Sequence, residues 1–140
     1  MELFTGGLLS IAGILIGAGI TYLLSIRAQR DNSLIEARNE AYSDYIRGVA
    51  SLAARKSEEG KTIVADAKAR IAIYGTSNVI AGLSQFDEIG ATLASDKGQR
   101  AFLEVVLAMR KGSNGMSDSV EQRDIYDLLF GSKPFDGNSE

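Results

Sequence analysis

The chain has 140 residues, 45% of them hydrophobic, and a net charge of −3 at pH 7. It contains neither cysteine nor histidine, which excludes disulfides, Cys–His and Ser–His–Asp catalysis and the common zinc sites. Its charges of both signs are mixed, without the clustered basic excess that is usual in nucleic-acid-binding proteins.

The N-terminal stretch from Leu3 to Ile26 carries no charged side chain. At 1.5 Å per residue, a helix of about 24 residues is ~36 Å long and can cross a hydrocarbon core of ~30 Å. A cleaved signal peptide has a positive N-terminal region and a shorter apolar core, whereas Met1 and Glu2 supply no positive side chain. The sequence therefore predicts a retained transmembrane anchor over residues 1–29.

Positive charges follow this stretch and do not precede it. All 15 Lys and Arg residues lie at or beyond Arg27, and Arg30 comes one turn later. By the positive-inside rule, the N-terminus is outside and the C-terminal domain is cytoplasmic, which predicts a single-pass protein of the cell inner membrane. Tyr22 lies just before Arg27, at the depth where aromatic rings anchor membrane helices.

Small residues recur along one face of the predicted membrane helix, with spacings of three or four. Two of them form a literal GxxxG motif, Gly13 to Gly17. Because apolar surface gives helices no reason to associate inside lipid, the close backbone approach that small residues allow becomes important. The pattern predicts a helix–helix interface with a second copy or a membrane-protein partner, formed by Gly6, Ser10, Gly13, Gly17 and Thr21.

Residues 30–131 have the apolar periodicity of a helical domain and no convincing strand. The first helix is expected to run to about Arg55, and Asp31–Ser33 is the place where a new helix could be capped. We expect a turn or a frayed helix end over Lys56–Gly60 and a disordered tail over residues 132–140. The further helices are expected at Lys61–Tyr74, from Thr76–Asn78 to about Leu93, from Ser95–Asp96 to Lys111, and from Ser117 or Ser119 to a stop at Gly131.

The predicted fold is all-α, with one N-terminal transmembrane helix followed by a small antiparallel bundle of four to five helices. Gly75 is expected to end its helix with a positive φ angle. Five aromatic residues fall on the apolar stripes and are expected in the core rather than around a ligand. They are Tyr42, Tyr45, Tyr74, Phe86 and Phe102.

The stretch from Ala67 to Phe86 contains Arg70, Tyr74, Gly75, Ser77 and Val79 in the spacing Arg-x-x-x-Tyr-Gly-small-Ser-x-Val. This pattern resembles one in small uncharacterised bacterial membrane proteins with one N-terminal membrane helix and a short helical domain. The usual Pro-Glu after the serine is replaced here by Asn78-Val79. The resemblance implies that architecture and implies no activity.

Candidate chemical sites are few. The start of the helix near Ser77 and Asn78 presents free amide groups, and Arg70 lies about one turn before Gly75, so together they could bind a small anion. Capping by Ser77 alone is the simpler interpretation. The acid pair Asp87-Glu88 is expected to be solvated, because adjacent helical side chains point about 100° apart.

The sequence therefore predicts a protein that is not an enzyme and needs no cofactor or metal. We expect it to act at the lipid bilayer by self-association or partner binding, as a scaffold or adaptor without a nucleic-acid partner. Two alternatives stay open. The first is a membrane-active, holin-like effector of bacterial or phage origin whose glycine-rich helix oligomerises in the bilayer, and the second is a sensor of a small anionic ligand.

Overall fold

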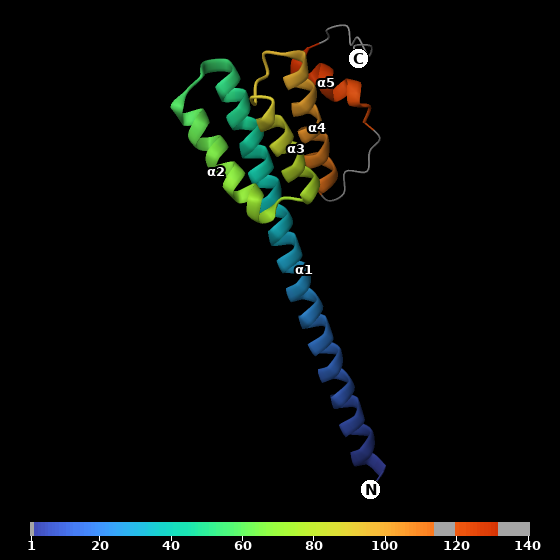
Figure 1. The fold of residues 1–140 in the computed structure, drawn as a ribbon. Helices are drawn as coiled ribbons and strands as arrows, with labels where there is room; N and C mark the ends of the chain where they lie inside the picture. The colour runs from blue at the N-terminus through green and yellow to red at the C-terminus, as the bar shows by residue number, and fades with distance from the viewer. Residues whose placement is uncertain (1, 114–119, 132–140) are drawn as a thin grey trace. The chain divides into compact units, whose positions relative to one another are not determined.

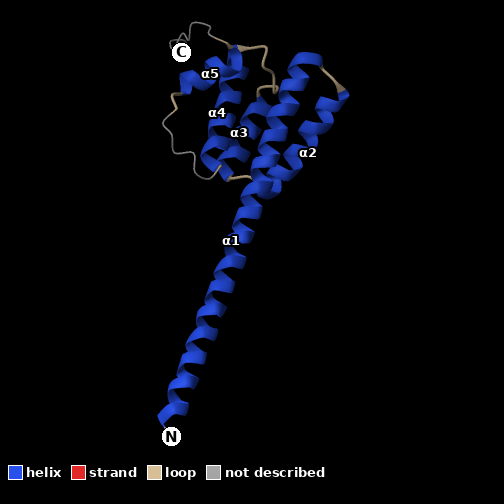
Figure 2. Cartoon of the chain, turned by 180° about the vertical axis from the view of Figure 1, so that it is seen from behind, coloured by secondary structure: helices blue, strands red, loops and turns tan. Residues whose placement is uncertain are grey.

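The computed structural model describes the backbone of residues 2–113 and 120–131, and within these ranges the side chains from Ile20 onward. Five α-helices follow one another along the chain (Figure 1), and the described residues form no strand (Figure 2). The all-α part of the predicted fold is thereby confirmed. The helices are α1 (Glu2–Arg55), α2 (Glu58–Tyr74), α3 (Ser77–Glu88), α4 (Asp96–Gly112) and α5 (Gln122–Phe130).

The chain divides into two compact units, residues 1–36 and residues 37–140. The first unit consists of the N-terminal part of α1, and the second contains the rest of α1 together with α2 to α5. The possible cap at Asp31–Ser33 does not interrupt α1. No glycine or proline lies between Ile20 and Arg47, so the backbone meets no helix breaker there.

Within the part of the chain whose side chains are described, no helix is long and apolar enough to cross a membrane. The side chains of residues 2–19, which make up most of the predicted membrane stretch, lie outside the described residues.

The helix α2 begins at Glu58, earlier than the predicted start at Lys61, so the expected turn or frayed end over Lys56–Gly60 is wrong for Glu58 to Gly60. Ser57 is the N-cap, and its hydroxyl oxygen accepts a hydrogen bond from the Gly60 N–H at 3.1 Å. Glu58 and Glu59 occupy the first turn, where the positive end of the helix dipole favours acidic side chains. Capping therefore converts an apparent turn into helix.

The helix α3 ends at Glu88, earlier than the predicted end near Leu93. Gly90 and Ala91 follow with φ angles of 92° and 47°, and this left-handed backbone cannot continue a helix. Leu93 is partly buried against the core from the connection that follows. Its apolar side chain thus fits the core although its backbone is not helical.

Gly75 ends α2 as predicted, but the expected positive φ angle is wrong. Its φ is −69°, a value open to any residue. A Cβ atom at this position would lie 2.5 Å from the Ile71 carbonyl oxygen, which accepts a hydrogen bond from the Gly75 N–H. Close backbone approach, rather than left-handed geometry, explains this glycine.

The C-terminal helix α5 begins at Gln122 and is followed by Gly131, which has a φ of 81° and is the predicted stop. Ser117 and Ser119, its predicted starting residues, lie outside the described residues. The predicted tail over residues 132–140 lies outside them as well.

The second unit packs around the C-terminal part of α1. Tyr42 and Tyr45 on α1 are buried, as are Phe86 on α3 and Phe102 on α4, which confirms four of the five predicted core aromatics. The rings of Phe86 and Phe102 lie 5.5 Å apart, centroid to centroid, an attractive aromatic pair. Tyr74 is only half-buried. The four buried aromatic residues share one core with Ala41, Val49, Ala67, Ile71, Val79, Leu83, Val105 and Met109.

Helices α1 and α2 approach closely at Gly48. A Cβ atom there would lie 2.7 Å from Val64 Cγ2 and 3.1 Å from the Val64 backbone nitrogen. Only a residue without a side chain fits this contact without moving the α2 backbone. Gly48 therefore sets the distance between the two helices.

Two α1 side chains bind the ends of three other helices. Arg38 donates from Nε to the Tyr74 carbonyl at the end of α2, at 2.7 Å, and from Nη1 to the Gly112 carbonyl at the end of α4, at 3.4 Å. The Tyr42 hydroxyl accepts the Thr76 N–H immediately before α3, at 3.1 Å. A cation at helix C-termini is favoured by the dipole, and the terminal backbone groups gain partners.

Replacing Arg38 with methionine should destabilise the second unit by about 1.5–3 kcal/mol, because two helix ends lose a charged donor while the aliphatic packing is kept. Thermal unfolding of the full chain, followed by tyrosine circular dichroism, measures the change. Arg47→Met is the matched control: Arg47 is 67% exposed and pairs with Asp44 on the same helix, so its loss should cost ~0.5 kcal/mol. Equal effects of the two substitutions would contradict the capping role of Arg38.

Candidate functional site

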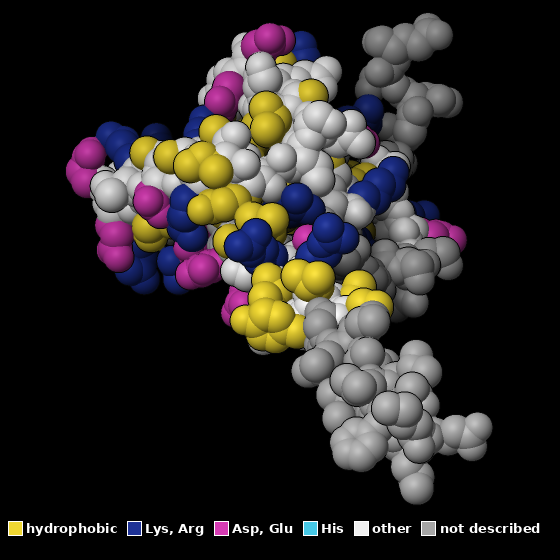
Figure 3. All heavy atoms as spheres, turned by 90° about the horizontal axis from the view of Figure 1, so that it is seen from below, with side chains coloured by type: hydrophobic (Ala, Val, Ile, Leu, Met, Phe, Trp, Pro, Cys, Tyr) yellow, Lys and Arg dark blue, Asp and Glu magenta, His cyan; other side chains and the backbone are white. Residues whose placement is uncertain are grey.

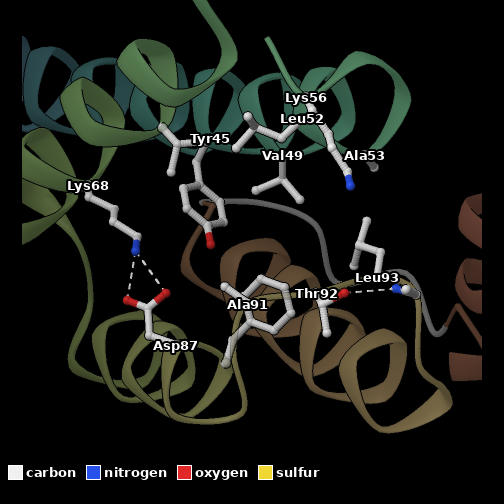
Figure 4. Close-up of a pocket in the computed structure, with 13 residues that line it drawn as sticks. Tyr45, Val49, Leu52, Ala53, Lys56, Lys68, Asp87, Ala91, Thr92 and Leu93 are labelled. Carbon is white, nitrogen blue, oxygen red and sulfur yellow. Dashed lines mark hydrogen bonds and ion pairs between the residues drawn. The ribbon is translucent and has the colours of Figure 1, made fainter. Parts of the chain in front are cut away.

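A pocket of about 360 Å³ lies in the second unit, at the lower end of the size range of small-molecule sites. It is bounded by α1, α2, α3 and the connection between α3 and α4 (Figure 4). Most of its wall is apolar, formed by Val49, Leu52, Ala53, Val64, Phe86, Ala91, Leu93 and Ala94.

Polar groups enter this pocket from three helices. In Figure 4 the Tyr45 hydroxyl points into the pocket from α1, and the Lys56 ammonium group reaches toward it from the end of the same helix. Lys68 on α2 donates to both carboxylate oxygens of Asp87 on α3, at 2.8 and 2.7 Å. The pocket thus holds one closed ion pair, one further ammonium group, one phenol and the Thr92 hydroxyl, which accepts a hydrogen bond from the Ala94 N–H at 3.2 Å.

The phenol of Tyr45 stays protonated. Burial of the ring raises the pKa of Tyr45 above its ordinary value, and the negative charge of Asp87 raises that pKa further. At neutral pH its hydroxyl can therefore donate a hydrogen bond to an acceptor inside the pocket.

The backbone at the edge of the pocket is strained at two places. Lys56 and Ala91 have φ angles of 48° and 47°. Among the described residues these are the non-glycine positions with left-handed φ, and both line the pocket. Residues other than glycine are sterically strained in this conformation. Such strained residues are often found at functional sites.

Arg70, one residue of the predicted anion site, is engaged by two carboxylates. Its guanidinium pairs with Asp66, at 2.8 Å, and with Asp44 on α1. Thr76, not Ser77, is the N-cap of α3, without a side-chain capping bond. Asn78 lines a separate shallow hollow between α3 and α4. The charge of Arg70 is thus already compensated by two carboxylates, and the anion site stays a prediction.

The residues predicted to set membrane contacts lie in the first unit. Thr21, Tyr22, Arg27 and Arg30 are exposed on α1, with Tyr22 66% exposed. The side chains of the other predicted interface residues lie outside the described part of the chain: Gly6, Ser10, Gly13 and Gly17.

Other chemistry is sparse in the described part of the chain. No group of three or more acidic side chains there is arranged to hold a metal ion. Asp87 is engaged by Lys68, and Glu88 beside it is exposed. Positive and negative side chains are interspersed on the face shown in Figure 3.

No protein-family model matches the sequence, and comparisons with curated proteins and with solved structures find no match either. The resemblance of Ala67–Phe86 to small single-pass membrane proteins therefore stays a prediction.

The pocket was not foreseen from the sequence, because its wall comes from four separate segments. One local signal was available: Lys56 directly follows a long helix, at a position where glycine is favoured. A lysine there could have been singled out as a residue kept for its charge.

Asp44 links α1 to α2 through Arg70, and this pair predicts a pH dependence. The hydrogen bond from Arg70 lowers the pKa of Asp44 below its ordinary 3.8, with a further contribution from Arg47. A carboxyl whose pKa is lowered by folding stabilises the protein above its unfolded pKa, and this stabilisation is lost as pH falls through the folded pKa.

Asp44→Asn should therefore lower the unfolding free energy by about 1 kcal/mol at pH 7, and the difference from the parent chain should shrink below about pH 4. Thermal or urea unfolding at a series of pH values measures it. Asp96→Asn, at an exposed position at the start of α4, is a control for the loss of one negative charge. A difference that stays constant down to pH 2 would contradict the role of the Asp44–Arg70 pair.

Proposed function

We propose that the chain is a single-pass membrane protein that acts by association. Residues Leu3–Ile26 span the bilayer with the N-terminus outside. The second unit is a helical domain on the cytoplasmic side that binds a second copy or a partner protein, without catalysing a reaction. The observation that carries this proposal is the exposed apolar end of the uncharged stretch in α1.

Apolar side chains at this end are uncovered by the described part of the chain. Leu23 and Leu24 are 63% and 60% exposed on α1, and Ile20 is exposed as well. Fully burying one such side chain is worth about 1.5–3 kcal/mol, so a run of them exposed to water is unfavourable. A bilayer would surround the helix and cover these side chains on every side. A small partner surface would cover only one side.

The hydrogen bonding of the same segment suits lipid. The Ser25 hydroxyl donates to the Tyr22 carbonyl of its own helix at 2.8 Å. A polar group in hydrocarbon needs such an internal partner, because no water is present to supply one. Arg27 and Arg30, both exposed, follow one turn later and suit the headgroup region on the cytoplasmic side.

The anchor is tested by adding a charge within the stretch. Ile16→Arg should release the full-length protein from membranes into the alkaline carbonate extract, because an arginine at the bilayer centre costs about 2.5–3.5 kcal/mol. Ile73→Arg introduces the same change on α2, where Ile73 is 73% exposed, and should leave the protein in the membrane pellet. Complete extraction of the unmodified chain would overturn the proposal.

Self-association is tested at the small-residue face. Gly17→Leu should weaken the oligomer of the full chain in detergent, because a bulky side chain separates the helix backbones. Gly7→Leu adds the same side chain off the predicted face and should have little effect. Analytical ultracentrifugation measures both. A chain that is monomeric before substitution would leave partner binding as the mode of association and exclude the homo-oligomer.

A further inference from the structure

We propose that the pocket between α1, α2 and α3 binds a small monocarboxylate whose charge pairs with the Lys56 ammonium group and whose apolar body lies along the apolar wall. This inference concerns the second unit alone and is independent of whether Leu3–Ile26 crosses a membrane.

The net charge of the pocket side chains favours a ligand with one negative charge. Lys68 and Asp87 neutralise one another in a two-oxygen contact. Lys56 forms no ion pair with a side chain that the structure describes. Two ammonium groups and one carboxylate leave a single positive charge in the pocket. A monoanion balances it, whereas a dianion would leave a negative charge unpaired beside Asp87.

The apolar walls of the pocket favour a ligand with a small apolar group. Val49, Val64 and Leu93 line the pocket from three segments. The volume of about 360 Å³ lies near the lower end of the range of small-molecule sites. A short aliphatic or aromatic acid fills such a space, and its tail displaces water from apolar walls that water solvates poorly.

The placement of Lys56 supports a role beyond the end of a helix. A residue in left-handed geometry at this position would ordinarily be glycine, which adopts the conformation at no steric cost. The chain instead carries a lysine whose ammonium group reaches the pocket (Figure 4). Ala91, the other strained residue, lies on the same pocket. Both residues with strained backbone therefore lie at the proposed binding pocket.

Tyr45 adds a hydroxyl to the pocket wall. Its ring is buried in the core, so the hydroxyl is held in a fixed position within the pocket. A carboxylate at Lys56 would receive a charged hydrogen bond, and its tail would lie along Val49 and Leu93.

The test is methyl NMR of the full chain in detergent, titrated with hexanoate and with hexanamide. Hexanoate should shift the Val49, Val64 and Leu93 methyl resonances in a saturable manner and leave that of the exposed Leu128 on α5 unchanged. Hexanamide has a similar body without the charge and should bind about tenfold more weakly or worse. Equal shifts with both compounds, or shifts confined to residues outside the pocket, would overturn the proposal.

Substitutions at Lys56 separate binding from stability. Lys56→Gln should weaken hexanoate binding about tenfold, while Arg55→Gln, which removes the neighbouring charge outside the pocket, should not change it. Lys56→Gly should also lose binding, yet raise the thermal midpoint because glycine relieves the left-handed strain. Unchanged hexanoate affinity in Lys56→Gln would contradict the assignment.

Discussion

The contacts that Arg38 and Tyr42 make with the ends of α2, α3 and α4 are the constraint on which the helical domain depends. Helix termini leave backbone groups without intrahelical partners, and here one turn of α1 supplies partners for three termini. The same stripe of α1 continues at spacings of three and four through Tyr45, Val49 and Leu52, which line the pocket. One helix face therefore fixes both where the other helices end and which side chains meet in the pocket.

The two parts of α1 differ in their chemistry. The stretch from Leu3 to Ile26 has no charge, whereas the part from Ala37 to Arg55 has one buried stripe and a charged remainder. We propose that the first part is solvated by lipid and the second by the core of its own domain. An uninterrupted helix can serve both environments because its backbone hydrogen bonds are internal, and only the side chains differ between them.

The apolar periodicity of the sequence predicted those features that depend on a single segment of the chain. The helical class, the burial of Tyr42 and Tyr45, and the stop at Gly131 followed from spacing and from glycine chemistry. Contacts between segments did not follow. Gly48 is needed because Val64 lies against it, and the pocket exists because four segments meet. The end of α3 was misplaced because Leu93 fits the apolar period and still packs on the core from a non-helical connection.

The central claim is that α1 crosses a bilayer with the helical domain inside, and cysteine accessibility in intact cells tests it most directly. The chain has no cysteine of its own, so Glu2→Cys, Ile16→Cys and Ser43→Cys each create a single reporter in the full-length protein. A membrane-impermeant maleimide should label Glu2→Cys in intact cells. It should label Ser43→Cys only after the cells are opened, and Ile16→Cys only after detergent is added. Labelling of Ile16→Cys as fast as Ser43→Cys in opened cells without detergent would contradict the account.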